Sequence, residues 1–116
     1  MRNIDREMLE LAAKAAGIEG KWAKWDHAYG DYREYGLDYG GRTLWNPITD
    51  DGDALRLAVK LKLTPMMRDF GCDVTDFVGI GCAYEKWSSD PYADTRRAIV
   101  RAAAEIGREI KNGEVK

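Results

Sequence analysis

The sequence predicts one α+β domain, residues 1–116, in which three helices pack on a single antiparallel sheet of about four to five strands, as in an α-β-α sandwich. Two observations support this prediction. Three segments carry apolar residues at the spacing of an α-helix, and the segments between them alternate apolar and polar residues or contain glycine turns. A chain of 116 residues has room for one such domain.

The first predicted helix runs from Asp5 to Ala16. Asp5 is the expected N-cap, and Gly17 supplies the left-handed residue that ends the helix. Ile4 is expected to pack on Leu9 as a hydrophobic staple. Its expected apolar face consists of Met8, Leu11, Ala12 and Ala15.

The second predicted helix follows the corner at Asn46-Pro47, where the residue before proline is restricted to an extended conformation. Thr49 or Asp50 can accept the N–H groups of the first turn, and the aspartates there complement the helix dipole. The apolar side is expected to consist of Ala54, Leu55, Ala58, Val59 and Leu61.

The third predicted helix begins at Asp90-Pro91, an N-cap followed by proline, and ends at Asn112-Gly113. Its buried stripe is expected to be Ile99, Ala102, Ala103, Ile106 and Ile110. Charged residues on another face neutralise one another at helical spacing: Asp94, Arg97, Arg101, Glu105 and Arg108. Arg96 points away from this face, so it is the arginine that we expect to be available to a ligand.

Strands are predicted for Lys21–Asp26, Tyr35–Tyr39, Arg42–Trp45, Thr64–Phe70 and Val78–Tyr84. Gly40-Gly41 is expected to join the second and third of these as a two-residue hairpin turn. Pro65 lacks an N–H group, and it therefore fits the beginning of a strand or the edge of the sheet better than a central position.

Composition excludes several classes of function. Eighteen basic and twenty acidic side chains give a net charge of −2, so we do not expect duplex nucleic acid as a partner. No apolar run reaches the ~20 residues that span a bilayer, so we expect no membrane association. The first residues lack the apolar stretch of a signal peptide, which predicts a cytoplasmic protein.

Residues for metal binding and nucleophilic catalysis are few. Cys72 and Cys82 lack Cys-x-x-Cys spacing, and His27 is the single histidine, so we expect buried thiols and no metal or other cofactor. A nucleophilic pair of one cysteine with His27 remains as an alternative. No nucleophile motif, phosphate loop or dinucleotide fingerprint is present, and no catalytic residue is predicted.

The segment from Trp22 to Trp45 mixes tyrosine and tryptophan with glycine and aspartate, a composition typical of recognition loops. The alternative is a hairpin whose rings cover the edge of the sheet. We expect the partner-binding residues to be Trp25, Tyr29, Asp31, Tyr32, Tyr35 and Tyr39.

A ligand pocket is the second candidate site, formed by Trp45, Asn46 and Arg96. The nearby Asp50, Asp51 and Asp53 have the oxygen ligands that hard cations prefer. Capping of a helix explains the same three residues without a metal ion, and we favour capping.

The stretches Trp45–Leu61 and Asp90–Gly107, together with Glu10–Gly17, resemble a group of small proteins encoded by tailed phages and prophages, similar to the phage ABA-sandwich domain. These stretches cover about half of the chain. The resemblance implies a helix–sheet–helix sandwich and a phage origin, and it carries no catalytic residue.

The combined expectation is a phage-encoded, non-enzymatic binding protein in the bacterial cytoplasm. It would inhibit a host defence component by protein–protein contact through an aromatic and acidic surface, and a homodimer is compatible with this function. One alternative is a sponge that sequesters a nucleotide-type signal molecule. A second alternative is a small metal-dependent hydrolase that uses His27 or the pair Asp50 and Asp53.

Overall fold

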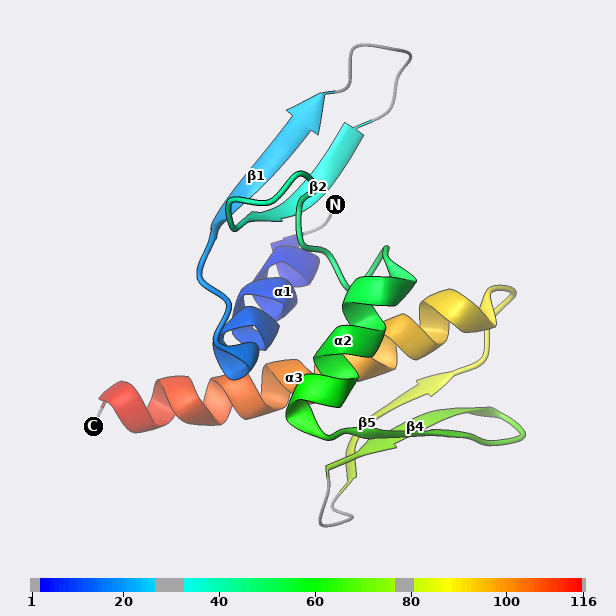
Figure 1. Ribbon diagram of the computed structural model, residues 1–116. Coiled ribbons are helices and arrows are strands. Elements are labelled where there is room, and N and C mark those ends of the chain that lie inside the picture. Colours follow the sequence, from blue (N-terminus) through cyan, green and yellow to red (C-terminus); the bar gives the residue numbers. More distant parts are fainter. Residues whose placement is uncertain (1–2, 27–32, 77–80, 116) are drawn as a thin grey trace.

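The protein, described as a computed structural model over residues 3–26, 33–76 and 81–115, is an α+β molecule with three helices and two small antiparallel sheets (Figure 1). The helices are α1 (Asn3–Ala16), α2 (Asp51–Leu61) and α3 (Pro91–Val115). One sheet holds β1 (Lys21–Asp26) and β2 (Arg33–Asp38). The other holds β3 (Thr64–Met67), β4 (Gly71–Thr75) and β5 (Gly81–Lys86) in that order. The α+β class is confirmed, whereas the prediction of a single sheet with four to five strands is wrong.

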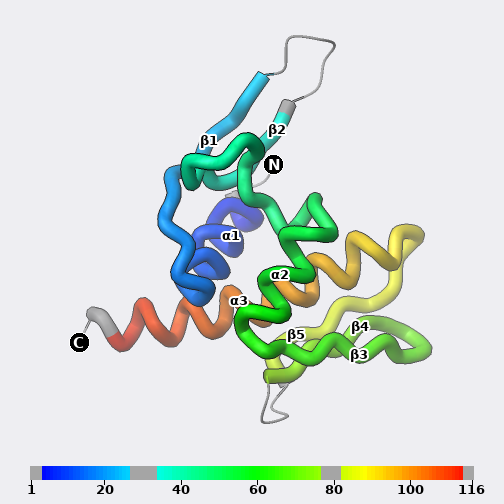
Figure 2. Tube along the Cα trace, viewed as in Figure 1, coloured from blue at the N-terminus to red at the C-terminus, as the bar shows by residue number. Residues whose placement is uncertain are grey.

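The two described sheets lie apart, with the helices between them (Figure 2). β2 pairs with β1 along its full length, from Lys21 opposite Asp38 to Asp26 opposite Arg33. The expected hairpin of Tyr35–Tyr39 with Arg42–Trp45 is reduced to one bridge, in which Leu37 and Trp45 exchange two backbone hydrogen bonds of 3.0 and 2.9 Å.

Proline explains why this pairing does not continue toward α2. The next hydrogen-bonded position along an antiparallel ladder would place residue 47 opposite Tyr35, and Pro47 has no N–H to donate. The carbonyl of Tyr35 instead accepts from Asn46 Nδ2 at 2.9 Å. The segment Arg42–Trp45 therefore leads into α2 without forming a third strand, and the described sheet consists of β1 and β2.

α3 is the central element, and it contacts α1, α2 and all three strands of the larger sheet. Because neighbours surround it, buried residues spread beyond one stripe: Ala98, Ile99, Val100, Ala102, Ala103 and Ala104. Ile106 is half-buried and packs against the core, whereas Ile110 is exposed, so the predicted stripe is wrong at its last residue. The helix also continues through Asn112-Gly113 to Val115, past its predicted end.

α1 begins at Asn3, two residues before the predicted N-cap. Asp5 consequently lies inside the first turn, where it is buried and accepts hydrogen bonds from the Arg97 guanidinium at 3.0 and 3.1 Å. Ile4 is 57% exposed, so the expected staple with Leu9 is also wrong. The buried face consists of Leu9, Leu11, Ala12, Ala13 and Ala16.

α2 begins as expected, because the Asp50 side chain accepts from the Asp53 backbone N–H at 2.8 Å. Lys62 ends the helix in a left-handed conformation with φ 56°. The buried residues are Ala54, Leu57 and Ala58. Leu55 and Val59, which were expected in the core, are 64% and 69% exposed.

The three-stranded sheet differs from expectation in its strand boundaries. β3 ends at Met67, short of Phe70, and β4 then runs back beside it as a strand that the sequence did not predict. β5 ends two residues beyond the predicted Tyr84; the beginning of the predicted strand at Val78 lies outside the described residues. β4 is central and contributes Cys72 and Val74 to the core, and Pro65 lies on the edge strand as expected.

Candidate binding cleft

A cleft of about 580 Å³ lies between β2, the segment 39–46 and the first turns of α2. Its wall includes Tyr35, Tyr39, Asn46, Asp50, Asp53 and Arg56. Two of these residues belong to the predicted partner-binding set, and a third belongs to the predicted ligand pocket. The fold thus brings together side chains from both candidate sites.

Asn46 builds the wall of this cleft through its hydrogen bonds. Its Nδ2 donates to the Tyr35 carbonyl, its backbone N–H donates to Asp53 Oδ2 at 3.0 Å, and its Oδ1 accepts from Ile48 N–H at 3.0 Å. The residue is 3% exposed. These bonds connect β2 to the start of α2, so the role that the structure gives Asn46 is to hold the two sides of the cleft together.

Charged groups of opposite sign meet on the α2 side of the cleft. Arg56 donates to Asp53 at 2.8 Å, and its guanidinium lies 3.8 Å from Asp50. The hydrogen bond with Asp53 raises the pKa of Arg56, and the charges of Asp53 and Asp50 act in the same direction against desolvation. On the other side, Glu34 accepts from the Leu44 backbone N–H. Among the lining residues that the structure describes, three carboxylates against one guanidinium make the cleft acidic.

Tyr39 lies at the mouth of the cleft and is 50% exposed. The turn beside it is closed by Asp38, whose Oδ1 accepts from Gly40 N–H at 3.0 Å, and Gly40 has a φ of +93°. Gly41 passes so close that an added Cβ would be 2.8 Å from the Tyr39 ring. Glycine at these two positions therefore permits the turn and the close approach of the backbone to the Tyr39 ring.

Of the other rings in the segment from Trp22 to Trp45, those that the structure describes do not share one face. Trp22 packs near Tyr35 with ring centroids 6.5 Å apart, and the Arg6 guanidinium lies 5.5 Å from the Trp22 ring centre. Trp25 is half-buried and sits opposite Glu34 in the strand pair. Tyr29, Asp31 and Tyr32 lie outside the described residues, as does His27. Their role in partner binding stays a prediction.

The structure does not unite Trp45, Asn46 and Arg96 in one cavity. Trp45 is buried in the core, and Arg96 lines a different groove beyond α2. Arg96 donates to the Ile48 carbonyl and to Asp51 Oδ1, both at 2.7 Å, so the expectation that it is available to a ligand is wrong. Its partners lie 45 and more residues away, and helical spacing carries no information about them.

That second groove, of about 530 Å³, was missed by sequence reasoning. It is lined by Leu55 from α2, Met67 from β3 and Tyr92 from α3, with Pro65 and Trp87 between them. A signal was present, because apolar residues of α2 occupy more than one face: Ala54, Leu55, Leu57, Ala58, Val59 and Leu61. Such a wide distribution exceeds what one buried stripe requires.

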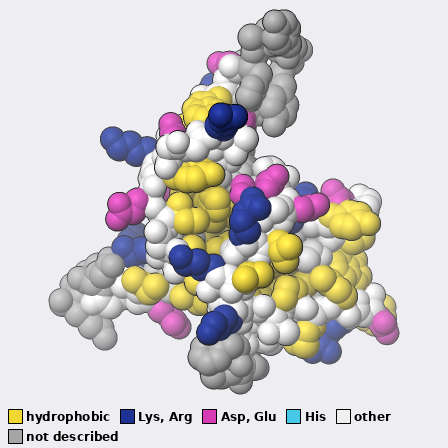
Figure 3. Space-filling view, viewed as in Figure 1, with side chains coloured by type: hydrophobic (Ala, Val, Ile, Leu, Met, Phe, Trp, Pro, Cys, Tyr) yellow, Lys and Arg dark blue, Asp and Glu magenta, His cyan; other side chains and the backbone are white. Residues whose placement is uncertain are grey.

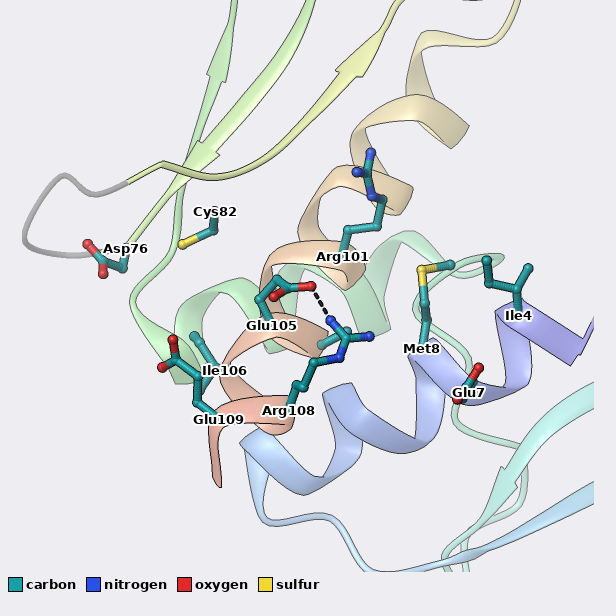
Figure 4. Close-up of a pocket in the computed structure, with 11 residues that line it drawn as sticks. Ile4, Glu7, Met8, Asp76, Cys82, Arg101, Glu105, Ile106, Arg108 and Glu109 are labelled. Atoms are coloured by element: carbon teal, nitrogen blue, oxygen red, sulfur yellow. Dashed lines mark hydrogen bonds and ion pairs between the residues drawn. The ribbon is translucent and has the colours of Figure 1, made fainter. Parts of the chain in front are cut away.

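A third cleft, of about 610 Å³, lies between α1, α3 and the strands (Figure 4). Its side chains include Glu7, Asp76, Glu105 and Glu109 with Arg101 and Arg108, and Glu105 is paired with Arg108. Cys82 faces this space, and burial raises the pKa of its thiol, as burial also does for Cys72. Both thiols thus favour the protonated form, which is a poor nucleophile.

Within residues 3–26, 33–76 and 81–115, no three His, Cys, Asp or Glu side chains are grouped as metal ligands. None of the helices in those ranges combines the length and the apolar character needed to cross a membrane.

The comparisons with known proteins give no relative for this chain. Neither the protein-family models, nor the curated proteins, nor the solved structures contain a match to the sequence or the fold. The resemblance to small phage proteins therefore stays a prediction.

Proposed function

We propose that the chain is a non-enzymatic binding protein that holds a basic segment of a protein partner in the cleft between β2 and α2. The observation that carries this proposal is the convergence of Tyr35 and Tyr39 with the carboxylates of Asp50 and Asp53 on one cleft. These residues come from two separate stretches of sequence, and the bonds of Asn46 hold the stretches together.

The chemistry of the cleft favours a cation over an anion. Among the described lining residues, three carboxylates exceed one guanidinium, and the Asp50 side chain is 59% exposed. The exposed Tyr39 ring adds an apolar, quadrupolar face on which a Lys or Arg side chain can lie. The acidic balance of the whole chain would steer such a partner toward the protein at low salt.

The predicted phage origin suggests which partner to seek. If the chain acts inside a bacterium that a phage infects, the partner is a host protein with a basic surface, and a component of a defence system is our leading candidate. Occupying that surface would inhibit the host protein without any catalytic step.

The test is retention of a host protein on the immobilised chain. We expect Tyr39→Ala to reduce retention at least tenfold, because it removes the ring at the mouth of the cleft. Tyr84→Ala is the matched control, since Tyr84 is 46% exposed on β5 and lies outside this cleft.

Asp50→Asn tests the charge separately. Asparagine caps a helix as well as aspartate does, so the substitution removes the charge and keeps α2. We expect weaker retention and a smaller dependence on salt. Equal retention by the parent chain, Tyr39→Ala and Asp50→Asn would refute binding at this cleft.

A further inference from the structure

An apolar patch covers the exposed side of α2 and the neighbouring parts of β3 and α3. The exposed side chains are Leu55 and Val59 on α2, Met67 on β3, Phe70 in the following turn and Tyr92 at the start of α3, each at least 62% exposed. Trp87, which follows β5, is bonded to the turn after β3. Its backbone N–H donates to the Phe70 carbonyl, and its Nε1 donates to the Arg68 carbonyl. Figure 3 shows hydrophobic side chains gathered over α2 and the neighbouring sheet.

The size of the patch is that of an interaction surface. An aromatic side chain offers about 150–250 Å², so the two rings and three aliphatic side chains together offer several hundred Å². The largest apolar patches of monomeric proteins measure roughly 300–600 Å². Stable interfaces bury about 800 Å² on each partner, and the charged ends of α2 beside the patch can supply the remainder.

The exposed stripe of α2 has an acidic beginning and a basic end. Asp51, Leu55, Val59 and Lys62 follow one another at spacings of four, four and three residues, which places them along one side of the helix. Asp51 is 77% exposed on its side chain, although it pairs with Arg96, and Lys60 and Lys62 are exposed at the other end.

This pattern is complementary to itself under a two-fold rotation. When two copies of α2 lie antiparallel, Leu55 of one copy meets Val59 of the other, and the same contact is repeated by symmetry. In the same register Lys62 of each copy lies one residue from the position opposite Asp51 of the other, within reach of its long side chain. Apolar contacts then occupy the centre and opposite charges lie at both ends, which is the usual composition of a protein interface.

We propose that the chain forms a two-fold symmetric homodimer in which the α2 helices pack antiparallel through Leu55 and Val59, with the patch residues Met67, Phe70 and Tyr92 buried around them. The cleft that carries Tyr39 uses other residues. Dimer formation and partner binding are therefore independent, and each can fail without the other.

The first test is the molar mass in solution, measured by sedimentation equilibrium over a wide range of protein concentration. We expect twice the 13.1 kDa of the chain at high concentration. Leu55→Asp combined with Val59→Asp should raise the dissociation constant at least tenfold. Melting followed by circular dichroism should stay cooperative, because both residues are exposed. Ile4→Asp is the control, since Ile4 is 57% exposed on α1.

The second test uses charge reversal to fix the partner and the register. Asp51→Lys alone places two lysines together at both ends of the interface, and Lys62→Asp alone places two aspartates together. Each variant should therefore dimerise less than the parent chain. An equimolar mixture should form a heterodimer, because both ends then carry opposite charges.

A monomer at every concentration would overturn the proposal. So would a dimer that survives the double substitution at Leu55 and Val59, because its interface would lie elsewhere. Failure of the mixture to dimerise better than its components would exclude the antiparallel register.

Discussion

The side chain of Asn46 supplies a hydrogen bond to β2 that the backbone of a neighbouring strand would otherwise supply. Its amide donates to the Tyr35 carbonyl at the position where a proline cannot, and its Oδ1 accepts from Ile48 N–H as the chain turns toward α2. The sequence indicated a corner at Asn46-Pro47, and the corner is present. The hydrogen bond to Tyr35 was not predictable, since it depends on β2 lying alongside.

We predict that Asn46→Ala lowers the free energy of unfolding by about 2–3 kcal/mol, because buried groups lose their hydrogen-bond partners. Urea denaturation measures this change. Thr43→Ala is the control, as Thr43 lines the same cleft and is exposed. Equal effects of the two substitutions would contradict the role assigned to Asn46.

Cys72 links stability to pH. Burial raises the pKa of its thiol, so the folded state keeps the proton at a pH where the unfolded chain has lost it. The stabilisation is therefore complete below the unfolded thiol pKa of about 8.5, and it is lost as the pH rises through the folded value. We expect the melting temperature to fall between pH 8 and 10, and to fall less in Cys72→Ala. An identical pH profile for both proteins would refute the link.

At the scale of elements, the packing of α1 on α3 depends on a glycine. A Cβ added to Gly107 would lie 1.9 Å from the Leu11 carbonyl oxygen, so the two backbones approach as closely as glycine permits. The sequence predicted both helices, but not this crossing, because periodicity identifies a helix and not the point where another helix crosses it.

The pair Gly107→Ala and Gly113→Ala tests this crossing. Both substitutions improve helix propensity by up to about 1 kcal/mol, but a Cβ at Gly113 meets nothing within 4 Å. We expect Gly113→Ala to raise the free energy of unfolding slightly, whereas Gly107→Ala lowers it by about 1–3 kcal/mol through overpacking. A stabilising effect of both substitutions, measured by chemical denaturation, would contradict the close contact.

The helices were more predictable than the strands, for a physical reason. Asp50 and Asp90-Pro91 mark helix starts through local hydrogen bonds and fixed dihedral angles, and both starts are confirmed. Strand pairing depends on residues far along the chain, and β4 offered only the short alternation of Cys72 and Val74 with Asp73 and Thr75. For α2, periodicity identified the helix but assigned Leu55 and Val59 to the core, because apolar residues look alike whether they face the core or a patch.

At the scale of the whole molecule, α3 joins two parts that share one core, to which α1, β2, α2, β4 and α3 all contribute. The β1–β2 sheet extends from α1, and the three-stranded sheet packs on the first half of α3 (Figure 1). The molecule is accordingly flat, with extents of 44, 41 and 23 Å. The candidate cleft and the apolar patch lie on different sides of α2, and neither location followed from the sequence, since both depend on how the two parts meet.

Pro65 limits hydrogen bonding at the open edge of the three-stranded sheet. β3 is the terminal strand of its sheet, and Arg68 N–H donates to the Gly71 carbonyl, so hydrogen-bonded positions alternate from there and leave the proline nitrogen on the outer side. A strand from a neighbouring molecule would have no backbone N–H to accept from at Pro65. This disfavours the repeated edge-to-edge pairing of strands by which fibrils grow. A concentrated solution of the protein should accordingly resist amyloid-like growth through the β3 edge.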